Sequence, residues 1–241
     1  MNIINRIRIG VINLVGLAMI QSAAICADET GNKPIQLSLC HPMQVFDSDT
    51  SIYGLRLDLI YGINYDVRGL DLGISNKVEG NLYGLQAGIL SYTEGDIFGL
   101  QIAASNFVEG DLNGVQFGFL QWSEGDVKGL QTSLVNYVDG DLAGVQFGAL
   151  NYSASVAEGV QFGVVNHTIG NAEVQFGAVN LAEELSGAQF GFVNLTTVGY
   201  TELQVGIINL AKEPVGVQVG LLNIITSNEI WKVLPIINFR W

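Results

Sequence analysis

The sequence predicts an all-β protein, and three observations support this fold class. A phrase of about fifteen residues, such as GLQAGILSYTEGDIF from Gly84, recurs from Gly54 to the last residue. Within each copy, apolar residues alternate with small or amide residues, which is the period of a β-strand with two unlike faces. The chain contains 30 Gly and 4 Pro, so strands joined by glycine-rich turns account for it better than a disordered linker.

The N-terminus is a separate element, a predicted secretory signal peptide over residues 1–27. Arg6 and Arg8 precede a twelve-residue apolar run, and small residues follow it up to Ala27. Basic, apolar and small segments in that order are typical of export signals. Removal of this segment leaves 8 basic and 23 acidic residues, a net charge of −15. We therefore expect no nucleic-acid partner.

The remaining residues, 28–241, are predicted to form a single repeat-built β domain. Repeats of about fifteen residues fill the region from 54 to 241, and they begin at Gly54, Gly69, Gly84, Gly99, Gly114, Gly129, Gly144, Gly159, Glu173, Gly187, Glu202, Gly216 and Trp231. Numbered from this first residue, positions 2, 4 and 6 are apolar, position 3 is usually Gln and position 8 is usually Asn. Positions 10 to 13 of the regular copies read x-Glu-Gly-Asp, a sequence typical of turns.

The preferred fold is an antiparallel meander that closes into an outer-membrane-type β-barrel of about 14 strands. Thirteen copies of the repeat and one strand-like run, residues 35–46, give that even number. About eleven residues of each copy are extended, which is the length of a tilted membrane-spanning strand. Positions 10 and 14 alternate over two repeats, as expected when successive turns lie at opposite ends of a sheet. In this barrel the apolar positions and the Asn face lipid, and the Gln lines a polar lumen.

A β-solenoid with 15-residue coils is the alternative fold. Positions 3, 8 and 13 lie five residues apart, so three sides of five residues can close one coil. Stacked amide side chains stabilise such assemblies, and because an amide donates and accepts at once, a structural ladder competes with the lumen interpretation. The candidate ladder residues are Gln86, Gln101, Gln116, Gln131, Gln146, Gln161, Asn106, Asn136, Asn151 and Asn166.

The acidic turns are the main candidates for ligand chemistry. In four successive turns two carboxylates flank a Gly, and hard cations such as Ca²⁺ prefer several oxygen ligands. These pairs are weak calcium candidates, since two carboxylates do not complete a calcium shell and Asp and Glu are common solvated turn residues. The residues are Glu94, Asp96, Glu109, Asp111, Glu124, Asp126, Asp139 and Asp141. No cofactor is expected.

The C-terminus carries a predicted insertion signal. Ile237, Phe239 and Trp241 alternate on one face, and the chain ends on an aromatic residue. This ending resembles the signal that is recognised when outer-membrane barrels are inserted. The expected partners are therefore outer-membrane lipid and the barrel-insertion machinery.

Several blocks of the sequence resemble a known family. These are YGLRLDLIYG from Tyr53, the GLQ-x-G-x-x-N repeats, and the closing LPIINFRW. Together they are similar to the bacterial surface-repeat family first recognised in Leptospira, and the resemblance covers essentially the whole chain after the signal peptide. It implies a diderm bacterium, export and a surface location, and it supplies no catalytic residue or ligand. This copy departs from the pattern at Ser91, Gln121, Glu173 and Glu202.

The functional expectation follows from export and repetition. We expect an exported outer-membrane or cell-surface protein with a structural, adhesive or weak pore role. The alternative is a secreted or surface solenoid that acts as a binding or adhesion module for a host or surface ligand. No enzymatic activity is expected, because no nucleophile motif or unique pair of catalytic carboxylates occurs. A hydrolase on a repeat scaffold is the least favoured hypothesis.

Overall fold

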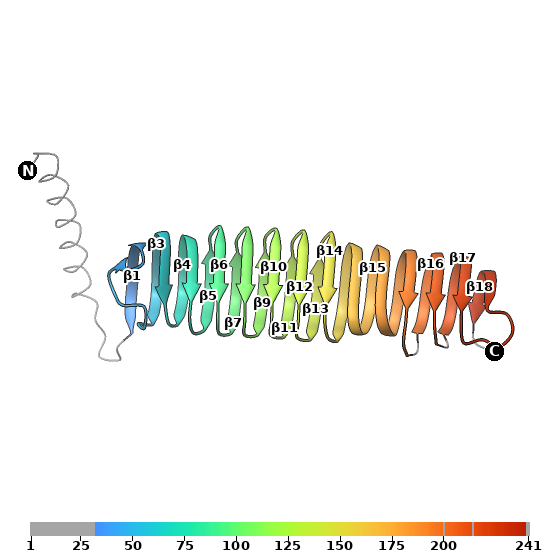
Figure 1. Cartoon of the computed structure of the whole chain (residues 1–241). Helices are drawn as coiled ribbons and strands as arrows, with labels where there is room; N and C mark the ends of the chain where they lie inside the picture. Colours follow the sequence, from blue (N-terminus) through green and yellow to red (C-terminus); the bar gives the residue numbers. More distant parts are fainter. Residues whose placement is uncertain (1–31, 200, 214, 240–241) are drawn as a thin grey trace, which may run out of the picture.

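One copy of the repeat forms one coil of a β-solenoid. The computed structural model describes residues 32–199, 201–213 and 215–239, and these stack as about 13 coils into a straight rod (Figure 1). In a regular coil a first strand spans positions 14 to 4, a bend follows at positions 5 and 6, and a second strand spans positions 7 to 10. The predicted signal peptide and Trp241 lie outside the described residues.

The strands follow this plan along the rod. The N-terminal strands are β1 (Lys33–Cys40), β2 (Met43–Gln44), β3 (Ile52–Asn64) and β4 (Val67–Val78). The regular coils contain β5 (Leu82–Ala87), β6 (Leu90–Thr93), β7 (Ile97–Ile102), β8 (Ser105–Val108), β9 (Leu112–Phe117), β10 (Leu120–Ser123), β11 (Val127–Thr132), β12 (Val135–Val138), β13 (Leu142–Phe147) and β14 (Leu150–Ser153). The last coils contain β15 (Ala157–Thr196), which continues through its bends, β16 (Thr201–Ala211), β17 (Val215–Ile225) and β18 (Val233–Phe239).

Neighbouring coils pair in parallel and in register. Gly129 lies opposite Gly144, and Gln131 lies opposite Gln146, so each side chain stacks on the same position of the next repeat. Antiparallel pairing among the described strands occurs at the two ends of the rod, between β1 and β2 and between β17 and β18. The all-β prediction is confirmed. The antiparallel barrel is wrong, and the solenoid alternative describes the molecule.

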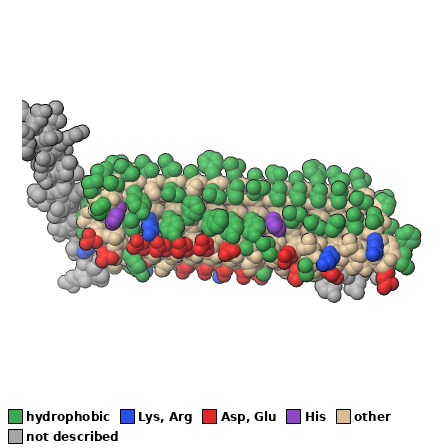
Figure 2. Space-filling view, in the orientation of Figure 1, with side chains coloured by type: hydrophobic (Ala, Val, Ile, Leu, Met, Phe, Trp, Pro, Cys, Tyr) green, Lys and Arg blue, Asp and Glu red, His purple; other side chains and the backbone are tan. Residues whose placement is uncertain are grey.

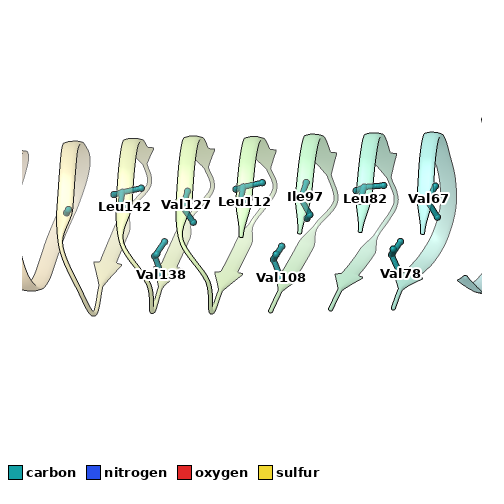
Figure 3. Packing of buried hydrophobic residues seen from close by; sticks show 10 residues of the cluster. Val67, Val78, Leu82, Ile97, Val108, Leu112, Val127, Val138 and Leu142 are labelled. Atoms are coloured by element: carbon teal, nitrogen blue, oxygen red, sulfur yellow. The ribbon is translucent and has the colours of Figure 1, made fainter. Parts of the chain in front are cut away.

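The alternation of positions 10 and 14 has a different cause from the one predicted. Both positions point into the rod and form its apolar core, as Figure 3 shows for Val78, Leu82 and Ile97. Over the regular coils a hydroxyl takes position 10 in every second coil, and Thr93 accepts a hydrogen bond from Gln101 of the next coil at 3.3 Å, as Ser123 does from Gln131 at 3.1 Å. The two-repeat period therefore reflects packing inside the rod, and the prediction that it marks opposite ends of a sheet is wrong.

Glycine at position 1 permits the close approach of successive coils. Gly129 has a φ of 142°, and a Cβ at this residue would lie 1.9 Å from the carbonyl oxygen of Gly114. Both the backbone conformation and the contact exclude a side chain here. Where Glu173 replaces the Gly, the interval from Gly159 falls to fourteen residues and no positive φ occurs at that position. At this coil the loss of one residue thus accompanies the loss of the positive φ.

Both ends of the rod are covered by local chain. At the N-terminal end the segment after β1 folds back, so that Val45 N–H donates to the Leu37 carbonyl at 3.1 Å and Phe46 N–H donates to Gln36 Oε1 at 3.0 Å. At the C-terminal end β18 lies antiparallel on β17. Covered edges matter because an open strand edge is a template for pairing with another chain.

Candidate interaction surface

A continuous ladder of Gln side chains runs inside the rod. Each Gln Nε2 donates to Oε1 of the Gln one coil earlier, at 2.7–3.0 Å. All six predicted Gln residues belong to it and are fully buried, and it continues through Gln175, Gln189, Gln204 and Gln218. The structural-ladder interpretation holds for these residues, and the prediction that they line a polar lumen is wrong.

A buried ion cluster closes the N-terminal end of the Gln ladder. Every amide in the ladder donates toward the N-terminus, and the first, Gln86, donates to Asp71 Oδ2 at 2.6 Å. Arg56 binds the same carboxylate through Nε and Nη2, each at 2.7 Å. The carboxylate thus accepts at the donor end of the ladder, where negative charge is favourable.

A second carboxylate shares this cluster. Asp58 Oδ2 lies 3.1 Å from Arg56 Nε, and both side chains are fully buried. Desolvation raises the pKa of Asp58 to about 7, and the charges of Arg56 and Asp71 act in opposite directions on it. The Arg56 guanidinium therefore forms ion pairs with two buried carboxylates, those of Asp71 and Asp58.

A second ladder, of Asn side chains at position 8, runs in the opposite direction. From Asn136 to Asn209 each Nδ2 donates to Oδ1 of the Asn one coil later, at 2.7–2.9 Å, and the row ends at Asn223. The predicted ladder residues Asn136, Asn151 and Asn166 lie in this run and are buried. Their inward direction corrects the prediction that position 8 faces lipid. The bend at positions 5 and 6 changes the alternation, so that positions 3 and 8 both point inward.

The Asn ladder is broken at the two sequence departures, Ser91 and Gln121. The predicted member Asn106 donates to Gln121 Oε1 at 2.9 Å. Among the described side chains, Ser91 Oγ, Asn106 Oδ1 and Gln121 Nε2 are buried without a hydrogen-bond partner. Ser is too short to continue the row of Asn amides. Gln is longer than Asn and places its amide out of line with that row.

Rows of aromatic rings lie on both outer faces. Phe147, Phe162, Phe176 and Phe190 stack at position 4 with centroids 4.8–5.0 Å apart. At position 9, Trp122 stacks on Tyr137 at 4.0 Å. Each ring covers the face of its neighbour, so the rows present ring edges outward. This arrangement does not offer the free ring faces that a stacking ligand needs.

The acidic turns form one long edge of the rod. Asp at position 13 accepts the backbone N–H of the equivalent residue one coil later, as Asp96 Oδ1 does from Asp111 at 2.9 Å. The same bond joins Asp111 to Asp126 and Asp126 to Asp141. The eight calcium candidates lie along this edge, and within residues 32–239, gaps excepted, no group of three or more His, Cys, Asp or Glu is placed to hold a metal. Backbone pairing explains why Asp recurs there.

The opposite long edge is apolar, and we call its position-6 residues the apolar ridge. They lie at the bend, where the large side chains are 46–73% exposed. These are Leu59, Ile74, Ile89, Phe119, Leu134, Val164, Phe192, Ile207 and Leu221. The flanking positions 4 and 7 carry no charged residue from Leu57 to Leu222. Figure 2 shows hydrophobic side chains along one edge of the rod and acidic side chains toward the other.

An open groove continues the ridge at the N-terminal end. It has a volume of about 520 Å³ and is mainly apolar, with Ser38, Asp58 and Gly73 as its other lining residues. Its apolar lining consists of Leu37, Leu39, Leu57, Leu59, Leu72 and Ile74. The sequence shows the apolar positions but not the ridge, because without the bend these positions form one flat strand face.

The C-terminal insertion-signal residues lie in the covering strand. Ile237 is about half exposed in β18, where it pairs with Val219 of β17, and Phe239 pairs with Val217. Their role as an insertion signal stays a prediction.

Comparison with protein-family models, curated proteins and solved structures found no match for this chain. The resemblance to the surface-repeat family therefore stays a prediction. The described part of the chain holds no helix of the length and apolar character needed to cross a membrane.

Proposed function

We propose that this chain is an exported surface β-solenoid that acts as a binding or adhesion module, with the apolar ridge as its contact surface. The observation that carries the proposal is the row of exposed apolar side chains, which are large in nine coils, as in Phe119 at 66% and Phe192 at 63% exposure, and Ala in the coils of Ala104, Ala149 and Ala178. A contiguous exposed apolar surface of this kind marks a contact site in a folded protein.

The interior favours binding over conduction. Buried Gln and Asn ladders and the apolar core occupy the inside of each coil, and both ladders consist of satisfied structural hydrogen bonds over most of their length. The signal-peptide pattern of residues 1–27 and the family resemblance support export to the cell surface. The proposed module binds its partner without catalysis.

Envelope retention tests the proposed function. Cells that export the wild type and the double variant Phe119→Ser with Leu134→Ser are fractionated, and their surface is digested with an added protease. We expect the wild type to be protease-accessible and envelope-bound, and the variant to be released. Phe98→Ser is the matched control, since Phe98 is 41% exposed but lies at position 15, off the ridge. Retention of the ridge variant at the wild-type level contradicts the proposal.

A further inference from the structure

We propose that the apolar ridge binds a lipid surface: the rod lies lengthwise on a membrane, with the ridge in lipid and the acidic edge in water. This inference rests on the proposed function and names its partner. Four features of the described residues support it.

The first feature is the order of side chains across the second strand. The ridge at position 6 is followed by an aromatic row at position 9, which includes Trp122 and Tyr137, and then by the acidic turn. The Tyr137 hydroxyl donates to Asp139 Oδ1 at 3.3 Å, on the acidic side. Tyr and Trp favour the boundary between lipid and water, because one end of the side chain is apolar and the other is polar. The rings therefore lie where that boundary would fall.

The second feature is the pairing of the backbone at the bend. Ile89 N–H donates to the Ile74 carbonyl at 2.8 Å, and Phe119 N–H donates to the Ala104 carbonyl at 2.9 Å. Hydrocarbon offers no hydrogen-bond partner, so backbone that contacts it must be paired within the protein. The ladder between coils supplies this pairing at the residues that form the ridge.

The third feature is the distribution of charge. Five residues separate the ridge at position 6 from the nearest acidic position of the turn, position 11, roughly 17 Å at about 3.3 Å per residue. That distance exceeds the Debye length of about 8 Å at physiological salt. The negative charge of the chain therefore does not oppose contact between the ridge and an uncharged lipid surface. We expect phosphatidylcholine to suffice.

The fourth feature is shape. The ridge is an edge, because the chain turns at positions 5 and 6 and the two strands recede on either side. Two such edges meet along a line and bury little of the flanking rows at positions 4 and 7. Lipid can close around both flanks at once, which favours a membrane over a second copy of this chain.

Vesicle flotation tests the proposal. The exported protein is mixed with phosphatidylcholine vesicles, and we expect it to float with them at low and at physiological salt. The double variant Phe119→Ser with Leu134→Ser should show an apparent affinity at least about tenfold lower, because two exposed apolar anchors are lost. The control Phe98→Ser should float like the wild type.

The depth of single Trp residues in the bilayer distinguishes an oriented rod from nonspecific adsorption. With Trp231→Phe and Trp241→Phe in the background, the remaining Trp is kept at 122 or moved by Trp122→Phe with Phe119→Trp or Glu124→Trp. Brominated phosphatidylcholine should quench fluorescence most at 119, less at 122 and least at 124. Equal quenching at 119 and 124 overturns the proposed orientation.

The remaining outcomes separate this inference from the proposed function. If the wild type does not float but forms a dimer that the ridge variant lacks, the lipid proposal is wrong and a second copy covers the ridge. If it does not float yet shows ridge-dependent envelope retention, the partner is another envelope component and the proposed function stands. Absence of both flotation and ridge-dependent retention contradicts both proposals.

Discussion

At the scale of single residues, the interior amides determine how well the coils stack. Asn151 shows the regular case, since it donates to Asn166 Oδ1 at 2.7 Å and to the Phe162 carbonyl at 2.8 Å. Ser91 and Gln121 occupy the same position and leave buried polar atoms unpaired. A buried polar atom without a partner costs free energy of folding, so these two residues are weak points of the rod.

Ser91→Asn and Gln121→Asn should each raise the free energy of unfolding, by about 1 kcal/mol. Each restores an amide that can donate to the Asn of the following coil. Urea unfolding of the purified variants measures the change, with Asn151→Ser as the opposite control that creates a break in an intact ladder. A fall in stability for Ser91→Asn and Gln121→Asn, or no loss for Asn151→Ser, contradicts the ladder account.

Gly129→Ala should destabilise the protein by about 3 kcal/mol or more, because a side chain is excluded both by the positive φ and by the Gly114 carbonyl. Glu173→Ala is the control at the same repeat position, where the chain already carries an exposed side chain, and it should change stability little. Thermal unfolding followed by circular dichroism compares the two. Equal effects at both residues would show that the glycine kink is not required.

Asp58 should make stability depend on pH. Its pKa is raised to about 7 in the folded protein, above its usual value near 4, so the folded state binds the proton more tightly than the unfolded state. The contribution of Asp58 to stability is then fully present below about pH 4 and is lost as pH rises through about 7. Asp58→Asn should remove this component and be more stable than the wild type at pH 8, with a smaller difference at pH 4. The urea midpoints of the wild type and the variant at both pH values measure this. A stability difference between the two proteins that does not grow with pH contradicts the assignment to Asp58.

At the scale of elements, strands and turns follow from the sequence, but their pairing does not. Alternation predicts one extended run of about eleven residues from position 14, whereas the bend at positions 5 and 6 divides that run into two strands, such as β13 and β14. Strict alternation cannot place Gln146 and Asn151 on one face, because they are five residues apart. The odd spacing indicates a bend in the solenoid, whereas in the barrel it places the Gln and the Asn on opposite faces of one strand. Strand length and an even number of strand-like segments fit the barrel, which is wrong, so neither feature distinguishes a barrel from a solenoid.

The covering strand β18 should keep the rod from assembling end to end. Truncation after Thr226 removes β18 and opens the parallel edge of β17, which can then pair with another chain. We expect elongated, thioflavin-positive assemblies of the truncated protein in mild detergent, while the full-length protein stays dispersed. Light scattering and electron microscopy measure this, and a dispersed truncated protein would contradict a covering role.

At the scale of the whole molecule, the rod has two unlike edges, and this asymmetry connects fold to function. Parallel, in-register stacking turns each repeat position into a row, so a single apolar residue at position 6 becomes the ridge and a single Asp becomes an acidic edge. The sequence predicts the rows once the stacking is known. It could not predict the site, because in the antiparallel barrel the same residues form a lipid-facing band without an edge.

Disulfide formation tests the parallel stacking most directly. Trp122 and Tyr137 are paired Cα partners in neighbouring coils, at a strand spacing of about 4.8 Å that a disulfide can bridge. Cys is placed at 122 and 137, or at 122 and 127 for comparison, in a background with Cys26→Ser and Cys40→Ser, and the crosslinks are identified by mass spectrometry. The solenoid predicts a bond between 122 and 137. A bond between 122 and 127 alone would contradict it, because only a hairpin brings those two residues together.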